Sequence, residues 1–216
     1  MKKNINLPKK ISIFPLSNFI IFPNTSVPLN IFEPRYIKMI DDCMKDNRII
    51  GMIQPKNNNN NPELYSIGCA GKISSFNETD DGRYLIVIKG LSRFKILNEI
   101  NNDKLYRECI VSFKEFNKDL IKNNNQIKFT ELELIFKNFK SLFKKQGYLI
   151  NWKDLEKQNF DQTLNTLVMA SPFSTEEKQI LLETVDIENR KIKLEKILKT
   201  YVLDNFNNKT LQWILN

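Results

Sequence analysis

The sequence predicts an α+β protein in which a strand-rich N-terminal half with one helix precedes an all-helical C-terminal half. Short apolar segments bounded by Pro, Asn and Ser fill residues 1–116, as is typical of strands. Beyond residue 125 the apolar residues recur at three- and four-residue spacing, as in amphipathic helices. A polar run rich in Asn and Lys lies between them. We therefore expect domains at 1–116 and 126–216, joined by a linker at 117–125.

Proline divides the first apolar stretch into strands. Proline has no N–H to donate to a sheet, so it is expected at strand ends, at edges or at bulges. Residues 11–31 contain three such breaks, at Pro15, Pro23 and Pro28. The strands expected between them are Ile11–Phe14, Phe19–Phe22 and Val27–Ile31.

After Phe32 the apolar spacing changes to that of a helix. Pro34 suits the first helical position, where its missing N–H costs nothing, and Glu33 would lie at the positive end of the helix dipole. The Glu-Pro-Arg tripeptide therefore indicates a helix start, and a strand is expected after the helix at Ile49–Ile53. The apolar stripe of this helix comprises Tyr36, Met39, Ile40, Cys43 and Met44.

The later strands surround a hairpin signal. Thr79–Gly82 reads TDDG, and Asp-Gly between two apolar runs favours a tight β-turn. A polar loop with five consecutive asparagines, Pro55–Pro62, comes before the hairpin. A closed or nearly closed barrel would protect the edges of this many strands. The expected strands are Ile67–Phe76, Tyr84–Ile88, Arg93–Ile100 and Leu105–Phe113.

The C-terminal half contains helix signals throughout. A stripe of large apolar residues predicts a helix over 126–146 that ends near Gly147. Ser174 and Glu177 have the spacing of a capping box, and Asp186 is placed to cap a last long helix. The stripe comprises Phe129, Leu132, Phe136, Phe139 and Phe143, and a further helix is expected around Leu164, Leu167 and Val168.

Residue usage excludes several kinds of chemistry. The chain has no histidine, which removes the usual activating base for Ser or Cys nucleophiles and histidine metal sites. Cys43, Cys69 and Cys109 are widely spaced, which argues against disulfide pairs and paired metal ligands. The segment Gly68–Ile73 fails as a phosphate loop because Ser66 and Ile73 occupy the Gly and Ser/Thr positions. We expect no enzymatic activity, cofactor or metal.

Charge and hydropathy bound the partners and the compartment. The N-terminus is basic but lacks the apolar core of a secretory signal, and no apolar run is long enough to span a bilayer, so we expect a cytoplasmic protein without membrane contact. The net charge of +8 raises the hypothesis of nucleic-acid binding. However, only 6 of the 33 basic residues are Arg, and the excess is spread over both halves.

Three blocks of the sequence resemble the N-terminal, substrate-binding domain of Lon proteases. They are FPLSNFIIFPNTSVPLNIFEPRYIKMIDDCMKDNRIIGMIQP, IGCAGKISSFNETDDGRYLIVIKGLSRFKI and SPFSTEEKQILLETVD. The likeness covers nearly the whole chain and is closest to short bacterial proteins that carry this domain alone, without ATPase and protease domains. It implies a PUA-like β pseudo-barrel with one helix, followed by a C-terminal helical bundle.

The resemblance implies a protein-binding role. The leading hypothesis is a non-enzymatic module that grips unfolded or extended protein segments, including as an adaptor to a protease or chaperone. The alternative is a PUA-like RNA-binding protein, which is the weaker hypothesis because the lysine charge is diffuse. The hallmark residues that match the family, and hence the candidate binding residues, are Pro28, Phe32, Glu33, Pro34, Arg35 and Tyr36, with Leu29 between them.

For Arg35, the sequence allows a structural role to be distinguished from a binding role. It falls in the first turn of the expected helix, where a positive charge is slightly unfavourable next to the dipole. We therefore expect a carboxylate, or strand carbonyls from the barrel, to hold it, and a mainly structural role.

Overall fold

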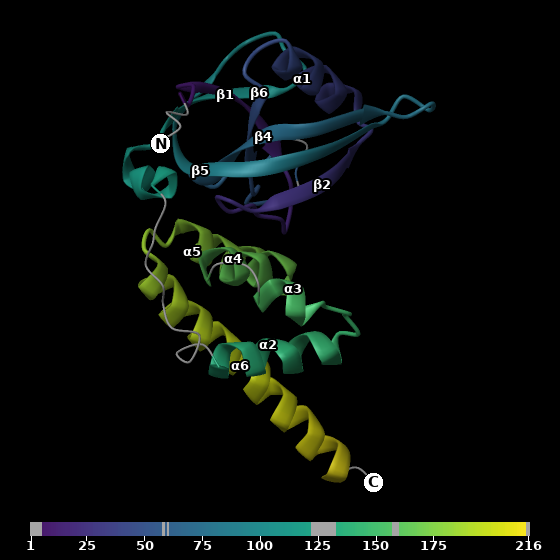
Figure 1. The fold of residues 1–216 in the computed structure, drawn as a ribbon, viewed down its shortest axis with the longest axis vertical. Helices are drawn as coiled ribbons and strands as arrows, with labels where there is room; N and C mark the ends of the chain where they lie inside the picture. Colours follow the sequence, from purple (N-terminus) through teal and green to yellow (C-terminus); the bar gives the residue numbers. More distant parts are fainter. Residues whose placement is uncertain (1–5, 58, 60, 122–132, 157–159, 215–216) are drawn as a thin grey trace. The chain divides into compact units, whose positions relative to one another are not determined.

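The computed structural model describes residues 6–57, 59, 61–121, 133–156 and 160–214 and confirms the α+β class (Figure 1). The chain divides into two compact units. The β unit comprises residues 1–123 together with Ser174–Glu183, and the helical unit comprises 124–173 and 184–216. One helix of the expected helical subdomain at 126–216 thus belongs with the strands, because buried hydrogen bonds described below hold it there.

The six strands of the β unit form one sheet in the order β2-β5-β4-β3-β1-β6, and a further pairing joins β5 to β6. Five strands therefore form a closed ring of pairings, and β2 is added outside it on β5. The β1–β3 pair is parallel and the others are antiparallel. The strands are β1 (Lys10–Pro15), β2 (Ser26–Ile31), β3 (Ile49–Ile53), β4 (Ile67–Glu78), β5 (Tyr84–Ile100) and β6 (Arg107–Ser112).

β5 is one continuous strand of 17 residues, although two strands were expected in this part of the sequence. Its first half pairs with β2 and its last residues pair with β6, while β4 runs alongside most of its length. Gly90 does not break the strand. A Cβ atom there would lie 2.0 Å from the carbonyl oxygen of Phe22, so glycine allows the preceding loop to approach the strand closely.

The expected strand at Phe19–Phe22 is wrong. Ile20, Ile21 and Phe22 are buried but form no sheet pairing. The backbone of Phe22 is instead satisfied by a turn, in which the Phe22 N–H donates to Thr25 Oγ1 at 3.3 Å and this hydroxyl donates to the Phe22 carbonyl at 2.7 Å. The apolar run at Phe19–Phe22 therefore indicates a buried segment and not a strand.

The predicted hairpin turn and first helix are confirmed. Gly82 has φ 79° in the β4–β5 turn, the left-handed conformation that glycine adopts without strain. Helix α1 (Pro34–Met44) begins with Pro34 in the first turn, and the Tyr36 and Ile37 N–H groups donate to the Glu33 carbonyl. Most of its predicted apolar stripe is buried, namely Tyr36, Met39, Ile40 and Cys43.

Two tyrosines tie the polar side of α1 to the sheet. The hydroxyl of Tyr84 on β5 donates to Asp41 at 2.9 Å, and that of Tyr106 donates to Asp42 at 2.8 Å. The bond to Asp41 raises the pKa of Tyr84 to about 12, since the carboxylate favours the protonated phenol. These adjacent aspartates therefore fix the helix to the sheet.

Helix α5 (Thr175–Glu183) is the helix that joins the β unit, and its capping box is confirmed. The Ser174 N–H donates to Glu177 at 2.8 Å, and the Glu177 N–H donates to Ser174 Oγ at 3.2 Å. Its buried Gln179 donates to the Ile67 carbonyl of β4 and accepts from the Gln54 amide, both at 3.0 Å. Such bonds between buried polar groups fix one arrangement of helix and strand.

The buried Arg93 of β5 binds two other elements at once. Its guanidinium forms a bidentate pair with Asp119, and the two side chains are 3% and 8% exposed. Asp119 lies in the 3-10 helix η1 (Lys114–Leu120), within the segment expected as a linker. Arg93 also lies 4.5 Å over the Phe116 ring and donates to the Leu182 carbonyl at the end of α5 at 3.0 Å.

The helical unit has its own aromatic core. Phe139 stacks on Phe143 at 5.7 Å and also contacts Phe173, as the predicted stripe requires; Phe129 and Leu132 lie outside the described residues. The predicted cap is present, since the Asn189 N–H donates to Asp186. The helices are α2 (Glu133–Lys145), the unpredicted short α3 (Trp152–Glu156), α4 (Phe160–Ala170) and α6 (Ile187–Ile214).

Replacing Arg93 by Ala should lower the free energy of unfolding by about 3–5 kcal/mol, because it leaves the Asp119 carboxylate buried without its partner. Urea denaturation followed by circular dichroism measures the change. Lys95→Ala is the matched control: its pair with Glu115 is exposed, so the expected loss is at most about 1 kcal/mol.

The double variant Arg93→Met with Asp119→Leu separates the buried charge from the lost contacts. It should be more stable than Arg93→Ala, since neither partner then leaves an unpaired buried charge. Equal losses in the single and double variants would contradict this account of the pair.

Candidate binding surfaces

The hallmark residues form the junction between β2 and α1, and they have different environments. Tyr36 is buried and its ring meets Phe14 of β1 edge-on at 4.4 Å, while Pro34 opens the helix. Pro28 lies exposed in the middle of β2, and Phe32, one residue beyond that strand, is 67% exposed. The junction thus contains both structural residues and residues that are available to a partner.

The carboxylate expected beside Arg35 is that of Glu33, two residues earlier. Arg35 Nη2 lies 2.8 Å from Glu33 Oε2, and its guanidinium lies 4.6 Å from the centre of the Tyr36 ring. Both charged side chains are nearly half exposed, so the pair is a local surface interaction.

At the margin of the closed ring and beyond it, β2, β5 and β4 form a three-stranded section with two unlike faces. Residues directly opposite each other on neighbouring strands share a face. Ile86 and Ile88 are buried, and their face also carries Tyr84, which bonds α1. We call the other face the open sheet face. It comprises Ser26, Pro28 and Asn30 of β2, Leu85, Val87 and Lys89 of β5, and Lys72, Ser75 and Asn77 of β4.

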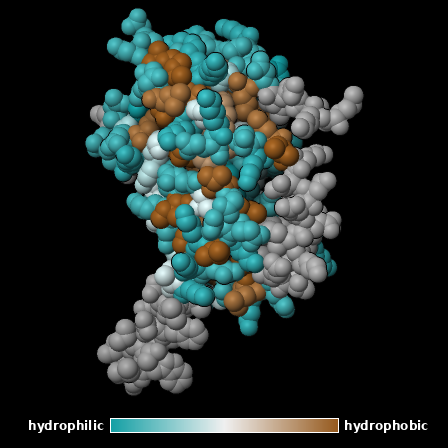
Figure 2. Space-filling model, turned by 90° about the vertical axis from the view of Figure 1, so that its left-hand side faces the viewer, coloured by the Kyte–Doolittle hydropathy of each residue, from teal (hydrophilic) through white to brown (hydrophobic). Residues whose placement is uncertain are grey.

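Every residue of the open sheet face is exposed except Val87, which is half-buried. Pro28 and Val87 are directly opposite each other, and Leu85, 44% exposed, lies one rung beyond Val87 on this face. On the side of the molecule in Figure 2, hydrophobic residues likewise reach the surface in separate patches among hydrophilic ones. Small exposed apolar patches of this kind are suited to contact with another chain.

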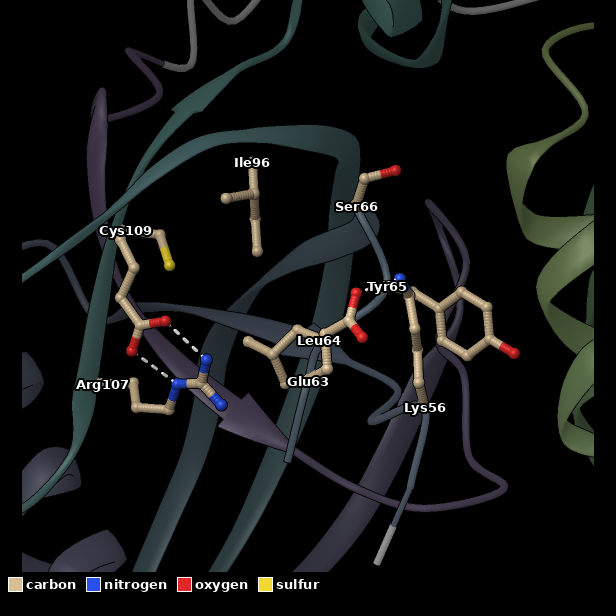
Figure 3. Close-up of a pocket in the computed structure, with 9 residues that line it drawn as sticks. Lys56, Glu63, Leu64, Tyr65, Ser66, Ile96, Arg107 and Cys109 are labelled. Carbon is tan, nitrogen blue, oxygen red and sulfur yellow. Dashed lines mark hydrogen bonds and ion pairs between the residues drawn. The ribbon is translucent and has the colours of Figure 1, made fainter. Parts of the chain in front are cut away.

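A separate pocket of about 400 Å³ lies in the β unit (Figure 3). Its charged groups are already paired: Lys56 with Glu63, and Arg107 with Glu99 at 2.6 Å, while Arg107 also donates to the Pro62 carbonyl at 2.7 Å. Leu64, Tyr65, Ser66, Ile96 and Cys109 complete the lining. Because its ions neutralise one another, the pocket offers no free charge to a substrate.

The thiol of Cys109 in this pocket is not an activated nucleophile. Burial raises the pKa of Cys109 to about 11, so the thiol is protonated at neutral pH. Cys43 and Cys69 are also buried and free, and burial raises the pKa of Cys43. All three cysteines are thus buried free thiols.

The described residues contain neither a helix suited to a membrane nor a cluster of metal ligands. No helix in the ranges given above is both long and apolar enough to cross a membrane. In the same part of the chain, no three or more Cys, Asp or Glu side chains gather where they could hold a metal ion.

The sequence pointed to Pro28 and Phe32 as candidates but not to Leu85 and Val87 on the neighbouring strand. Leu85 and Val87 belonged to an expected strand, yet nothing in that expectation said which face would be covered. The sequence does indicate which face of this strand is buried. Alternate residues form two sets: Tyr84, Ile86 and Ile88 are all largely apolar, whereas Leu85, Val87 and Lys89 include a charged residue.

Comparison with known proteins gives a family match. The model of the ATP-dependent protease La (LON) substrate-binding domain matches residues 10–200. The Lon protease of Desulfosudis oleivorans is 26% identical over 205 residues, which is 89% of this chain and 24% of that protein. The Lon protease of Dictyoglomus thermophilum is 23% identical over 210 residues, 92% of this chain and 24% of that protein. The chain thus spans about a quarter of the length of these curated relatives.

Two solved structures share the fold. The Lon N-terminal domain protein from Xanthomonas campestris superposes with a TM-score of 0.62 at 19% identity, covering 88% of this chain and 97% of that one. The N-terminal domain of the Mycobacterium avium complex Lon protease gives a TM-score of 0.59 at 17% identity, covering 88% and 98%.

Replacing Arg35 by Ala should lower the free energy of unfolding by only about 0.5–1.5 kcal/mol, the sum of an exposed ion pair and a surface cation–π contact. Thermal melting of the variant beside Glu33→Gln, which removes the same ion pair, measures the loss. A loss above about 3 kcal/mol would show that Arg35 holds the junction through more than these contacts.

The three thiols should be unreactive toward a disulfide reagent such as DTNB at pH 8 in the native protein, because all are buried. Addition of concentrated guanidinium chloride should release three equivalents. Rapid reaction of one thiol in the native protein, abolished in Cys109→Ala, would show instead that the pocket gives reagents access to Cys109.

Proposed function

Because the chain belongs to the family of the ATP-dependent protease La (LON) substrate-binding domain, we propose that it is a non-enzymatic module that binds unfolded or extended segments of other proteins. In this role it acts as an adaptor, holding a client that a protease or a chaperone then takes over. The relatives it matches are Lon proteases, whose substrates are polypeptides, and this supports a polypeptide as the ligand.

The open sheet face is the observation that carries the proposal. Neighbouring strands lie about 4.8 Å apart and each residue advances about 3.3 Å, so the face measures roughly 10 Å by 13 Å. This matches one extended chain and is much smaller than the roughly 800 Å² that a stable globular interface buries on each partner. A small, partly apolar surface favours weak, transient binding of many segments over tight binding of one folded partner.

RNA is the less well supported ligand. Four of the six arginines, at positions 35, 83, 93 and 107, form ion pairs within the chain. A fifth, Arg190, is buried and donates to Asn165 and to the Thr184 carbonyl. Arg93 and Arg190 are buried and cannot supply the bidentate contacts on which base recognition depends, and the other three would first have to give up their carboxylate partners.

The test is binding of a reduced and alkylated, permanently unfolded protein carrying a fluorophore, measured by anisotropy. Replacing Phe32 and Leu85 together by Ser should weaken binding by about tenfold or more, because each exposed side chain loses apolar area that the client would bury. The melting temperature should change little, since both residues are exposed. Adding salt should leave most of the affinity in place, because apolar burial is not screened.

Leu105→Ser is the matched control. Leu105 is 67% exposed, as Phe32 is, but it lies in the turn between β5 and β6. Its replacement should leave binding of the unfolded protein unchanged. If wild-type protein binds no unfolded polypeptide, or binds single-stranded RNA more tightly at near-physiological salt, the proposal fails.

A further inference from the structure

Two lysines lie side by side on the open sheet face. Lys72 of β4 is directly opposite Lys89 of β5 in the sheet register, and both side chains are exposed. Directly opposed side chains lie about 5 Å apart at Cβ, and like charges in this position destabilise a sheet. The arrangement therefore carries a local cost in the free protein.

Nothing in the described part of the chain neutralises this pair. Neither lysine takes part in any of the ion pairs there, whereas Lys56, Lys95 and Lys104 of the same unit each have a glutamate partner. None of the nine residues of the open sheet face is acidic. The nearby Arg83 is held by Asp81 within the hairpin turn, so the charge left over on this face belongs to Lys72 and Lys89.

The lysine pair borders the apolar part of the same face. Along β5, Lys89, Val87 and Leu85 follow one another at two-residue spacing on the open side. At about 3.3 Å per residue, Val87 lies about 7 Å from Lys89 and Leu85 about 13 Å from it. A partner that complements this face needs a negative group at one end and apolar groups at those two distances.

We propose that the open sheet face takes an extended polypeptide segment in which an acidic residue is followed, or preceded, at two-residue spacing by two apolar residues. Side chains of an extended chain share a face every second residue, so the segment repeats the 7 Å and 13 Å spacing of Lys89, Val87 and Leu85. The acidic side chain lies at Lys72 and Lys89, and the apolar ones lie on Pro28, Val87 and Leu85. The inference rests on the proposed function and adds the chemical class of client segment.

A peptide fits this face better than a nucleic acid does. Single-stranded nucleic acid is held by a continuous basic groove with aromatic rings on which successive bases stack. The middle of this face is instead aliphatic, with Pro28, Val87 and Leu85, and its positive charge is confined to one rung.

The experiment uses three fluorescent peptides that differ at one position. Each carries Leu at the second and fourth residues after a central Glu, Gln or Lys, in an otherwise Ser- and Gly-rich sequence. At low salt the wild-type chain should bind the Glu peptide about three- to tenfold more tightly than the Gln peptide, and the Lys peptide least well, as expected for one or two exposed charge contacts. The preference should shrink at 0.5 M salt.

The double variant Lys72→Gln with Lys89→Gln should lose the preference for Glu over Gln while binding the Gln peptide as wild type does. Together, the two proteins and the two peptides form a double-mutant cycle, which isolates the interaction between the two lysines and the Glu side chain of the peptide. The matched control is Lys45→Gln with Lys118→Gln, which makes the same change in net charge at two exposed lysines away from this face. It should keep the preference.

The outcomes separate the inference from the function on which it rests. Equal binding of the Glu and Gln peptides by wild type, or an equal effect of the two double variants, overturns the inference while binding of unfolded protein still supports the proposed function. Binding of neither peptides nor unfolded protein overturns both. Oligo(U) RNA that binds more tightly than the Glu peptide, and is lost in the Lys72/Lys89 variant, makes the face a nucleic-acid site and overturns the inference.

Discussion

The buried pair of Arg93 and Asp119 is the interaction on which the arrangement of the β unit depends. Arg93 lies in the middle of β5, between the residues that pair with β2 and those that pair with β6. From this point it binds η1 through Asp119 and the end of α5 through the Leu182 carbonyl. A guanidinium can satisfy all of these acceptors because its donors point in several fixed directions. One side chain thus joins the ring of strands to two segments that lie far beyond it in the sequence.

The same strand, β5, carries both Arg93 and part of the open sheet face. The ring uses the part of β5 that pairs with β6 and the part, up to Lys89, whose β4 partners also pair with β3. The remaining residues, Tyr84 to Ile88, extend past it with β2 and β4 on either side. α1 covers one face of that extension through Tyr84 and Asp41. On the other face no described element makes a comparable bond, and its side chains are exposed apart from the half-buried Val87. The candidate binding surface is therefore a consequence of building a strand longer than the ring requires.

Local signals in the sequence were sufficient for most elements. The capping box at Ser174 and Glu177, the Pro34 helix start and the Asp-Gly hairpin each depend on residues a few positions apart, and each is present in the structure. What failed depended on distant residues. The break expected between Ile88 and Arg93 is absent, and Gly90 in that interval instead allows the close approach of Phe22, 68 residues earlier in the chain. Gln54 holds α5 through Gln179, 125 positions later, which no local pattern reveals.

The candidate site likewise combines features set by neighbouring residues with features set by residues far apart in the sequence. The resemblance pointed to the β2–α1 junction, and four of its residues do reach the surface, namely Pro28, Phe32, Pro34 and Arg35, whereas Tyr36 is buried in the core. The juxtaposition of Lys72 and Lys89 could not be read from the sequence. It depends on the register of β4 against β5, which shifts by a bulge between Ala70 and Gly71 just before Lys72. A different register there would place another residue opposite Lys89, because pairing decides which side chains meet. The charge on this face is thus set by tertiary pairing, and a sequence identifies such a surface only once its sheet register is known.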